Sequence, residues 1–189
     1  MHSGGNSALD TRKLKAIGAL TLLSAFVPML FQGEEWGAST PFLYFTDHEN
    51  ADLGRAVAEG RDREFAAFNW QGEVPNPQEE STFLRSKLNW TEIGEASHAD
   101  LLDWHRRLIA LRGENLRSMS PRSRPQVKYR AKTRLLSYRH GMLLAIVNLS
   151  AAAQRITLPR GNWELVMASD PTQATLLTAS GTLIYRARR

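Results

Sequence analysis

Two pairs of adjacent glutamates are the residues of this chain whose types could do acid–base chemistry. Glu34-Glu35 follows a short apolar run, and Glu79-Glu80 follows a segment rich in proline and amide side chains. A catalytic acid or base must lie within hydrogen-bond reach of the reacting atoms, whereas adjacent residues of a strand point to opposite faces. Neither pair is therefore expected to act as a catalytic couple without a partner elsewhere.

Other reactive groupings are weak. His98 and His105 lie seven positions apart on a predicted helix, a separation of two turns or about 10 Å that does not suit one metal ion, so we interpret both as solvated. The sequence has no cysteine, which excludes disulfides, thiolate nucleophiles and zinc–thiolate sites. It has no glycine-rich phosphate loop either, and we expect neither a metal nor a cofactor.

The charge of the chain is divided unevenly. Residues 1–113 hold 11 Lys and Arg against 16 Asp and Glu, whereas residues 114–189 hold 13 against 3. Basic residues between Arg117 and Arg139 alternate with apolar ones, a pattern typical of the solvated face of a sheet. The alternatives are a polyanion site and docking on the acidic part of the same chain. We expect no nucleic-acid partner and no membrane partner.

An apolar run from Ala16 to Phe31 follows three basic residues, as in a signal peptide. The run is interrupted by Pro28, falls short of the roughly 20 residues that span a bilayer, and is not followed by a small-residue cleavage motif. We interpret it as a buried helix followed by a buried strand, with export or anchoring as the alternative.

The first 117 residues combine helical and strand patterns. They are interpreted as helices at Thr11–Ser24 and Ser97–Arg112, an amphipathic stretch at Ala51–Phe68 and an apolar parallel strand at Met29–Phe31. Asp10 is placed to cap the first helix. Ser97 and Asp100 form a capping box for the long one, which Gly113 is expected to end. The long helix presents one apolar stripe, made of Leu101, Trp104, Leu108 and Leu111.

After Gln126 the apolar period changes to two, which predicts a small antiparallel sandwich. The seven predicted strands are Val127–Tyr129, Leu135–Arg139, Met142–Leu149, Arg155–Leu158, Trp163–Met167, Ala174–Thr178 and Thr182–Tyr185. The third strand is apolar on both faces and should therefore be central.

Four blocks of the sequence resemble the α-amylase family of glycoside hydrolases. The first, PMLFQGEEW at residues 28–36, resembles the eighth barrel strand of that family. The others are GASTPFLYFTDH at 37–48, GRDREF at 60–65, and PNPQ at 75–78 with TFLRSKLNW at 82–90. In this order they resemble one branch, the malto-oligosyltrehalose trehalohydrolases.

The resemblance implies a retaining α-glycosidase that cleaves the α-1,4 bond next to the terminal trehalose unit of a malto-oligosyltrehalose. Such hydrolysis uses two carboxyl groups about 5 Å apart, and in this family these groups and a third aspartate lie on barrel strands N-terminal to this chain. A TIM barrel needs about 200 residues or more. We therefore predict no catalytic residue here and no hydrolysis by this chain alone; α-glucan would be the partner of a complete barrel.

Candidate sugar contacts lie just past the predicted strand, at the edge of a barrel where loops build the site. They are Glu35, as a hydrogen-bond partner of sugar hydroxyls, and Trp36, Phe42 and Phe45, as platforms for pyranose rings. In the alternative interpretation, the glutamates hold neighbouring backbone or an arginine such as Arg61 or Arg63, and the aromatic residues belong to the core.

The predicted fold class is α/β plus all-β: the C-terminal remnant of a (β/α)8 barrel, with its last helices and eighth strand, followed by a small antiparallel β-sandwich. We divide the chain into barrel residues 1–117 with a loop insertion at about 36–96, a linker at 118–125, and the sandwich at 126–189. Exposed barrel surface predicts self-association, and the lack of cysteine fits the cytoplasm. The alternative function is a non-catalytic carbohydrate-binding or protein-interaction module, with Trp163 and Tyr185 as contacts.

Overall fold

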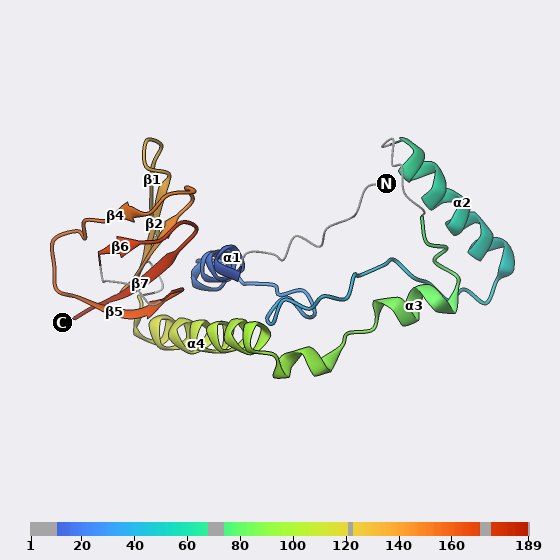
Figure 1. The fold of residues 1–189 in the computed structure, drawn as a ribbon, viewed down its shortest axis with the longest axis horizontal. Coiled ribbons are helices and arrows are strands. Elements are labelled where there is room, and N and C mark those ends of the chain that lie inside the picture. Colours follow the sequence, from blue (N-terminus) through green and yellow to red (C-terminus); the bar gives the residue numbers. More distant parts are fainter. Residues whose placement is uncertain (1–10, 68–73, 121–122, 171–174, 189) are drawn as a thin grey trace. The chain divides into compact units, whose positions relative to one another are not determined.

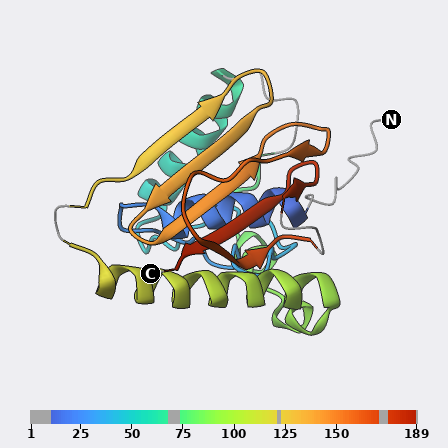
Figure 2. The same ribbon diagram turned by 90° about the vertical axis from the view of Figure 1, so that its left-hand side faces the viewer.

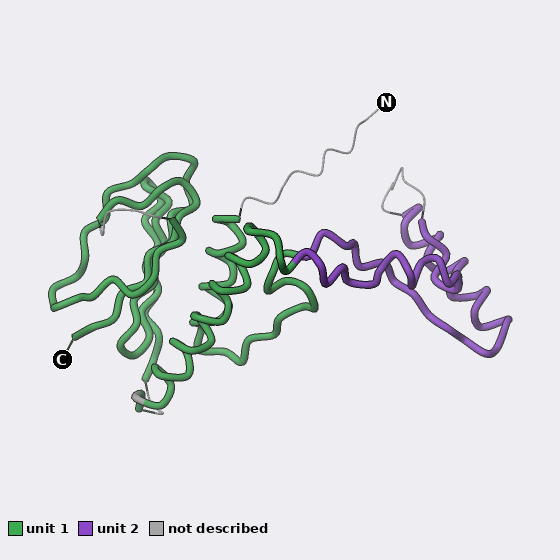
Figure 3. The backbone as a smooth tube through the Cα atoms, turned by 60° about the horizontal axis from the view of Figure 1, so that its bottom comes forward, with its two compact units in different colours: residues 1–37, 93–189 green, residues 38–92 purple. Residues whose placement is uncertain are grey.

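The computed structural model describes residues 11–67, 74–120, 123–170 and 175–188 (Figure 1). The helices are α1 (Thr11–Leu23), α2 (Ala51–Ala67), α3 (Glu80–Ser86), the 3-10 helix η1 (Trp90–Gly94) and α4 (Ala96–Ser118). The strands are β1 (Gln126–Arg130), β2 (Leu135–His140), β3 (Leu143–Asn148), β4 (Gln154–Arg155), β5 (Trp163–Ala168), β6 (Leu176–Leu177) and β7 (Thr182–Ala187). The chain forms two compact units: unit 1 is residues 1–37 with 93–189, and unit 2 is residues 38–92 (Figure 3).

Five of the seven predicted strands are confirmed over most of their length. The predicted strands Arg155–Leu158 and Ala174–Thr178 are each reduced to a two-residue strand, β4 and β6, and Ala174 lies outside the described residues. All pairings of the described strands are antiparallel. Five strands form one sheet in the order β1-β2-β3-β7-β5, and β4 pairs with β6 in a two-stranded ribbon. As predicted, β3 is central, and every one of its residues is buried. The antiparallel sandwich expected from the period-two pattern is therefore present.

The five-stranded sheet is covered on both faces, which explains why β3 lacks polar alternation. Leu143 and Ala145 of β3 pack with α1 and α4. The intervening residues, Leu144 and Ile146, pack on the other side with residues from the ribbon, such as Leu177. In Figure 2, α1 lies behind the sheet and α4 runs below it. Since successive strand residues point to opposite faces, unit 1 has two apolar cores separated by one sheet.

Asn148 ends β3 with a fully buried side chain. Its amide nitrogen donates to the carbonyl oxygens of Ala152 and Thr178, both at 2.8 Å, while its side-chain oxygen accepts from the backbone N–H of Ser150 at 3.0 Å. These bonds satisfy a polar group that would otherwise be costly to bury. They also connect the end of β3 to two turns.

Helices α1 and α4 pack against each other along the predicted stripe of α4, whose four residues are all buried. Gly18 of α1 lies against the ring of His105, where an added Cβ would come within 2.8 Å of Nε2. His105 is only 2% exposed, so its interpretation as a solvated histidine was wrong. Both helices share a core with the sheet and belong to the same compact unit as the strands. The domain boundary at residue 117 stays a prediction.

The ends of α4 differ from the predicted ones. The helix begins after Glu95, which makes no side-chain capping bond, so the capping box at Ser97 does not form. It also continues past Gly113 to Ser118. The extension places Asn115 so that it donates to the carbonyl of His140 and accepts from the N–H of Met142, both at 3.0 Å. These tertiary bonds outweigh the roughly 1 kcal/mol that an interior glycine costs a helix.

The predicted helix at Thr11–Ser24 is confirmed as α1, whereas Asp10 lies outside the described residues. The predicted strand at Met29–Phe31 does not form, because its backbone pairs with no other strand among the residues that the structure describes. Two of its three side chains are exposed, Met29 by 88% and Phe31 by 53%, whereas Leu30 is partly buried against the core of unit 1. Within the described segments, no helix combines the length and apolar character needed to cross a membrane.

Unit 2 contains more structure than the predicted loop insertion. The amphipathic stretch is confirmed as α2, and α3 and η1 were not expected. Glu92 is buried and accepts hydrogen bonds from the backbone N–H and the hydroxyl of Ser39, which joins the two ends of the unit. Gly54 of α2 lies against the side chain of Gln78, where an added Cβ would clash with Nε2. This contact fixes α2 to the segment that precedes α3.

Candidate functional site

The first glutamate pair lies in a tight turn of unit 1. Glu34 accepts a hydrogen bond from the backbone N–H of Phe31 at 3.0 Å through its carboxylate, and its carbonyl accepts from the N–H of Gly37 at 3.1 Å. Gly33 and Gly37 both have positive φ angles, of 84° and 68°, which favour glycine. The interpretation of Glu34 as a residue that holds neighbouring backbone is therefore confirmed.

Trp36 belongs to the core of unit 1. It is 2% exposed, and its carbonyl oxygen lies 2.7 Å from Nδ1 of His98 on α4. No pyranose ring can stack on this indole in the observed conformation, so a sugar contact would require it to be uncovered. Glu35, next to it, is partly exposed and remains a candidate hydrogen-bond partner.

Phe42 and Phe45 lie in unit 2 with much of each ring exposed, 54% and 37% respectively. Their ring centroids are 6.2 Å apart, and Phe45 makes an edge-to-face contact with Phe83 of α3 at 5.1 Å. Phe83 is 42% exposed. The three rings form an aromatic surface, called the Phe cluster below. Phe83 was not predicted as a member of this surface, because the helix that carries it, α3, was not predicted.

Arg61 contacts two aromatic rings and a carboxylate of unit 2. Its guanidinium lies over the rings of Tyr44 and Phe65, at 4.9 and 4.8 Å from the centroids, and pairs with Glu64 at 2.8 Å. Cation–π contacts of this kind stabilise aromatic residues in a loop. Arg61 therefore supports the loop that carries Phe42 and Phe45, two of the three rings of the Phe cluster.

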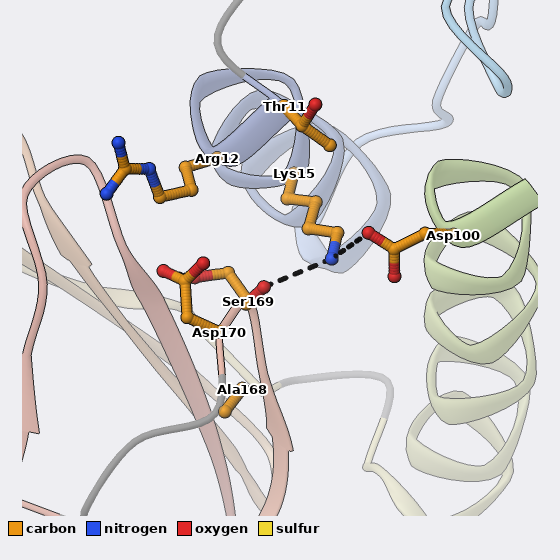
Figure 4. A pocket seen from close by; sticks show the side chains of 7 residues that line it. All are labelled: Thr11, Arg12, Lys15, Asp100, Ala168, Ser169 and Asp170. Atoms are coloured by element: carbon orange, nitrogen blue, oxygen red, sulfur yellow. Dashed lines mark hydrogen bonds and ion pairs between the residues drawn. The ribbon is translucent and has the colours of Figure 1, made fainter. Parts of the chain in front are cut away.

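A cavity of about 540 Å³ in unit 1 lies beside α1, the start of α4 and the end of β5 (Figure 4). The ammonium group of Lys15, whose side chain is 7% exposed, lies 2.7 Å from the carboxylate of Asp100 and donates to the carbonyl of Ser169 at 3.0 Å. The indole N–H of Trp104 donates to the carbonyl of Lys15 at 2.9 Å. With its charge paired in this way, Lys15 connects three elements rather than acting as a reactive amine.

Two tyrosines of unit 1 have a raised pKa, and neither can act as an acid or base near neutral pH. Burial raises the pKa of Tyr185 to about 12. Burial also raises the pKa of Tyr138, against the opposing effects of the Ala25 backbone and the charge of Arg112. Tyr185 is 1% exposed and cannot contact a ligand in this conformation, and Trp163 is engaged with Arg139, whose guanidinium lies 5.2 Å from its ring centroid.

In the described part of the chain, no three His, Asp or Glu side chains lie close enough together to hold a metal ion. The second glutamate pair, Glu79 and Glu80, lies in unit 2 at the start of α3. Unit 2 presents an exposed aromatic surface, the Phe cluster, on the same unit as the carboxylates of Glu79 and Glu80.

Comparison with known proteins places this arrangement in one enzyme class. No family model matches the sequence. The chain is 40% identical over 168 residues to the malto-oligosyltrehalose trehalohydrolase of Brevibacterium helvolum, covering 87% of this chain and 28% of that enzyme. It is 52% identical over 119 residues to the enzyme of the same name from Arthrobacter ramosus, covering 58% and 21%.

Solved structures agree with the sequence relatives. An α-amylase-type protein of Salmonella typhimurium matches with a TM-score of 0.77 and 33% identity, covering 95% of this chain and 31% of the other. The α-amylase of H. orenii, at 17% identity and a TM-score of 0.57, shares the fold. These matches define the class: the C-terminal part of an α-amylase-type glycoside hydrolase, with remnants of its barrel followed by a β-sandwich.

Within that class, the chain belongs to the malto-oligosyltrehalose trehalohydrolases. It spans about 28% of the length of the first curated relatives that it matches.

Proposed function

We propose that this chain supplies the C-terminal part of an enzyme that hydrolyses the α-1,4 bond next to the terminal trehalose unit of a malto-oligosyltrehalose and releases trehalose. The observation that carries the proposal is the 38–52% identity to six trehalohydrolases, of which the chain covers only 21–30%. Retaining hydrolysis needs a nucleophilic carboxylate and an acid on opposite sides of the scissile bond. We assign both groups to the remainder of the enzyme and expect the 189-residue chain alone to be inactive.

The exposed segment after α1 supports this assignment. Val27 is 94% exposed and Met29 88%, which is unusual for apolar side chains that follow a buried helix. A barrel strand is covered on both sides by neighbouring strands and helices. We therefore propose that residues 27–31 pair with barrel strands of the complete enzyme, and that the same surface drives self-association when those strands are missing.

We assign substrate contacts to Glu35, Phe42 and Phe45, with Trp36 contributing only if its indole becomes uncovered. Glu35 follows the segment that would form the last strand, and loops at this end of a barrel build the site. The partner in this proposal is an α-glucan that ends in trehalose, and the proposed location is the cytoplasm.

A chimaera tests the proposal. The part of the Brevibacterium helvolum enzyme that precedes the matched region is joined to residues 11–189 of this chain, and trehalose release from malto-oligosyltrehalose is measured. We expect release by the chimaera and none by the 189-residue chain. Within the chimaera, Met29→Asp should abolish release because it places a charge between barrel strands.

The matched control is Val127→Asp, which introduces the same charge at an exposed apolar residue of β1, 59% exposed. This variant should leave trehalose release unchanged. Release of trehalose by the chain alone, or a folded chimaera without activity, would contradict the proposal.

A further inference from the structure

A second cavity, of about 470 Å³, lies within unit 2 beside the Phe cluster. Its apolar wall is made of Phe45 and Phe83, and its polar wall includes Asp47, Glu79 and Glu80. The volume falls within the range of about 300–1,000 Å³ that is typical of small-molecule sites. The cavity therefore combines two exposed aromatic rings with carboxylate acceptors in a space that fits a sugar unit.

The walls of this cavity are fixed by hydrogen bonds. The N–H of Thr46 donates to the carbonyl of Pro77 at 2.8 Å, and the hydroxyl of Thr46 donates to the side-chain oxygen of Gln78. Gln78 in turn lies against Gly54 of α2. At the other wall, the hydroxyl of Thr82 donates to a backbone carbonyl at 2.7 Å and anchors α3, which carries Phe83. A site held in this way needs little rearrangement to bind a ligand.

The carboxylates of the cavity are available as acceptors. Asp47, Glu79 and Glu80 are all exposed, and none of them forms an ion pair with a residue in the described ranges. The carboxylate of Glu79 accepts a hydrogen bond from the hydroxyl of Ser81 at 3.1 Å. Hydrogen bonds to an ionised acceptor are stronger than those between neutral groups, so the hydroxyls of a sugar find strong partners here.

We infer that this cavity binds a glucosyl unit of an α-glucan without taking part in bond cleavage, with the C–H face of the pyranose on the Phe cluster and its hydroxyls on the three carboxylates. The class of ligand rests on the proposed function. The site itself rests on the cavity, its exposed rings and its exposed carboxylates, which form no ion pair within the described ranges. It follows that the isolated chain binds α-glucan although it does not hydrolyse it.

The test uses the 189-residue chain and maltoheptaose, with titration calorimetry for affinity and saturation-transfer NMR for the sugar protons in contact. We expect Phe83→Ala to weaken binding about tenfold, the change that a loss of about 1.4 kcal/mol produces, and Glu80→Ala to weaken it by a smaller factor. Phe83→Leu, which keeps apolar area but loses the flat face, should behave like Phe83→Ala.

Phe26→Ala is the matched control, because Phe26 is 79% exposed but lies in unit 1 outside the cavity. Its affinity for maltoheptaose should equal that of the unchanged chain. A β-1,4-linked glucan of equal length should bind more weakly, since its extended chain presents the rings differently to the fixed wall than the curved chain of an α-1,4-linked glucan.

Several outcomes would overturn the inference: no measurable binding by the folded chain, equal affinity in Phe83→Ala, or equal affinity for the β-linked glucan. An active chimaera together with an isolated chain that binds nothing would refute this site and leave the proposed function intact. Glucan binding by the isolated chain together with an inactive chimaera would support this site and refute the proposed function.

Discussion

Replacing Arg112 with methionine should loosen the end of α1 more than the rest of unit 1. The guanidinium of Arg112, on α4, donates to the carbonyls of Leu22 at 2.8 Å, Ser24 at 2.6 Å and Phe26 at 2.8 Å. These are carbonyls at or just beyond the C-terminus of α1, where a helix has no partners of its own. Helix α1 has no basic residue in its last turn, so Arg112 supplies from another helix the cation that its C-terminus lacks.

The magnitude follows from the three bonds. Two are partly buried and one is exposed; with about 1 kcal/mol for each partly buried bond and almost nothing for the exposed one, the loss is about 2 kcal/mol. The cation at the helix terminus adds about 0.5 kcal/mol. A total of about 2.5 kcal/mol corresponds to an increase of about 60-fold in the local opening equilibrium.

Hydrogen exchange of the backbone amides at residues 20–26, measured together with urea unfolding, tests this estimate. Arg112→Lys should recover the charge but not all three bonds, and should therefore lose about half as much. Arg107→Met is the matched control on the same helix, because its guanidinium makes only exposed contacts, with Val166 at 3.3 Å and Asp103 at 3.9 Å. That variant should change stability by less than about 0.5 kcal/mol.

The reasoning would be refuted by Arg112→Met retaining both the unfolding free energy and the exchange rates of the unchanged chain. It would also be refuted by faster exchange spread evenly over unit 1, since the bonds concern one helix end.

Three further results are expected. The pKa of Tyr185 is raised from 10.0 to about 12, so between these pH values the folded chain keeps a proton that the unfolded chain releases, and stability should fall as pH rises. Tyr185→Phe should remove about 3 kcal/mol or less of this fall, measured by urea unfolding at neutral and high pH. Gly18→Ala should cost about 1–3 kcal/mol in thermal melts because its Cβ meets His105, whereas Gly60→Ala, with open space around it, should be neutral or stabilising. A fragment of residues 126–189 should bind a hydrophobic dye, since the sheet face that α1 and α4 cover would be open to solvent.

The strands were predictable because their patterns are local. Short runs of period two separated by turns with glycine define hairpins whatever covers the sheet, and Gly141 and Gly161 do adopt positive φ. The apolar stripe of α4 was equally local. The end of that helix was not, because the hydrogen bonds of Asn115 to the β2–β3 turn cannot be read from a helical pattern. The seven-residue helix α3 is too short for periodicity to reveal.

The candidate site was predictable only in part, for a similar reason. The aromatic composition of residues 36–45 indicated possible sugar contacts, but sequence could not tell that Trp36 is buried beside His98 while Phe42 is exposed. Burial depends on which element packs over a loop. Phe83 was missed as a site residue although it lies in one of the blocks that carry the family resemblance, because nothing local joins it to Phe45.

Asn148 determines how β3 can align with its neighbours. In most half-buried strands, a shift of one residue is prevented because it would turn apolar side chains toward water. In β3 that penalty is absent, since both faces meet apolar layers. A displaced Asn148 would leave several hydrogen-bonding atoms without partners in a dry interior, at about 1–3 kcal/mol for each. The side-chain amide of Asn148 therefore fixes the register of this otherwise apolar strand.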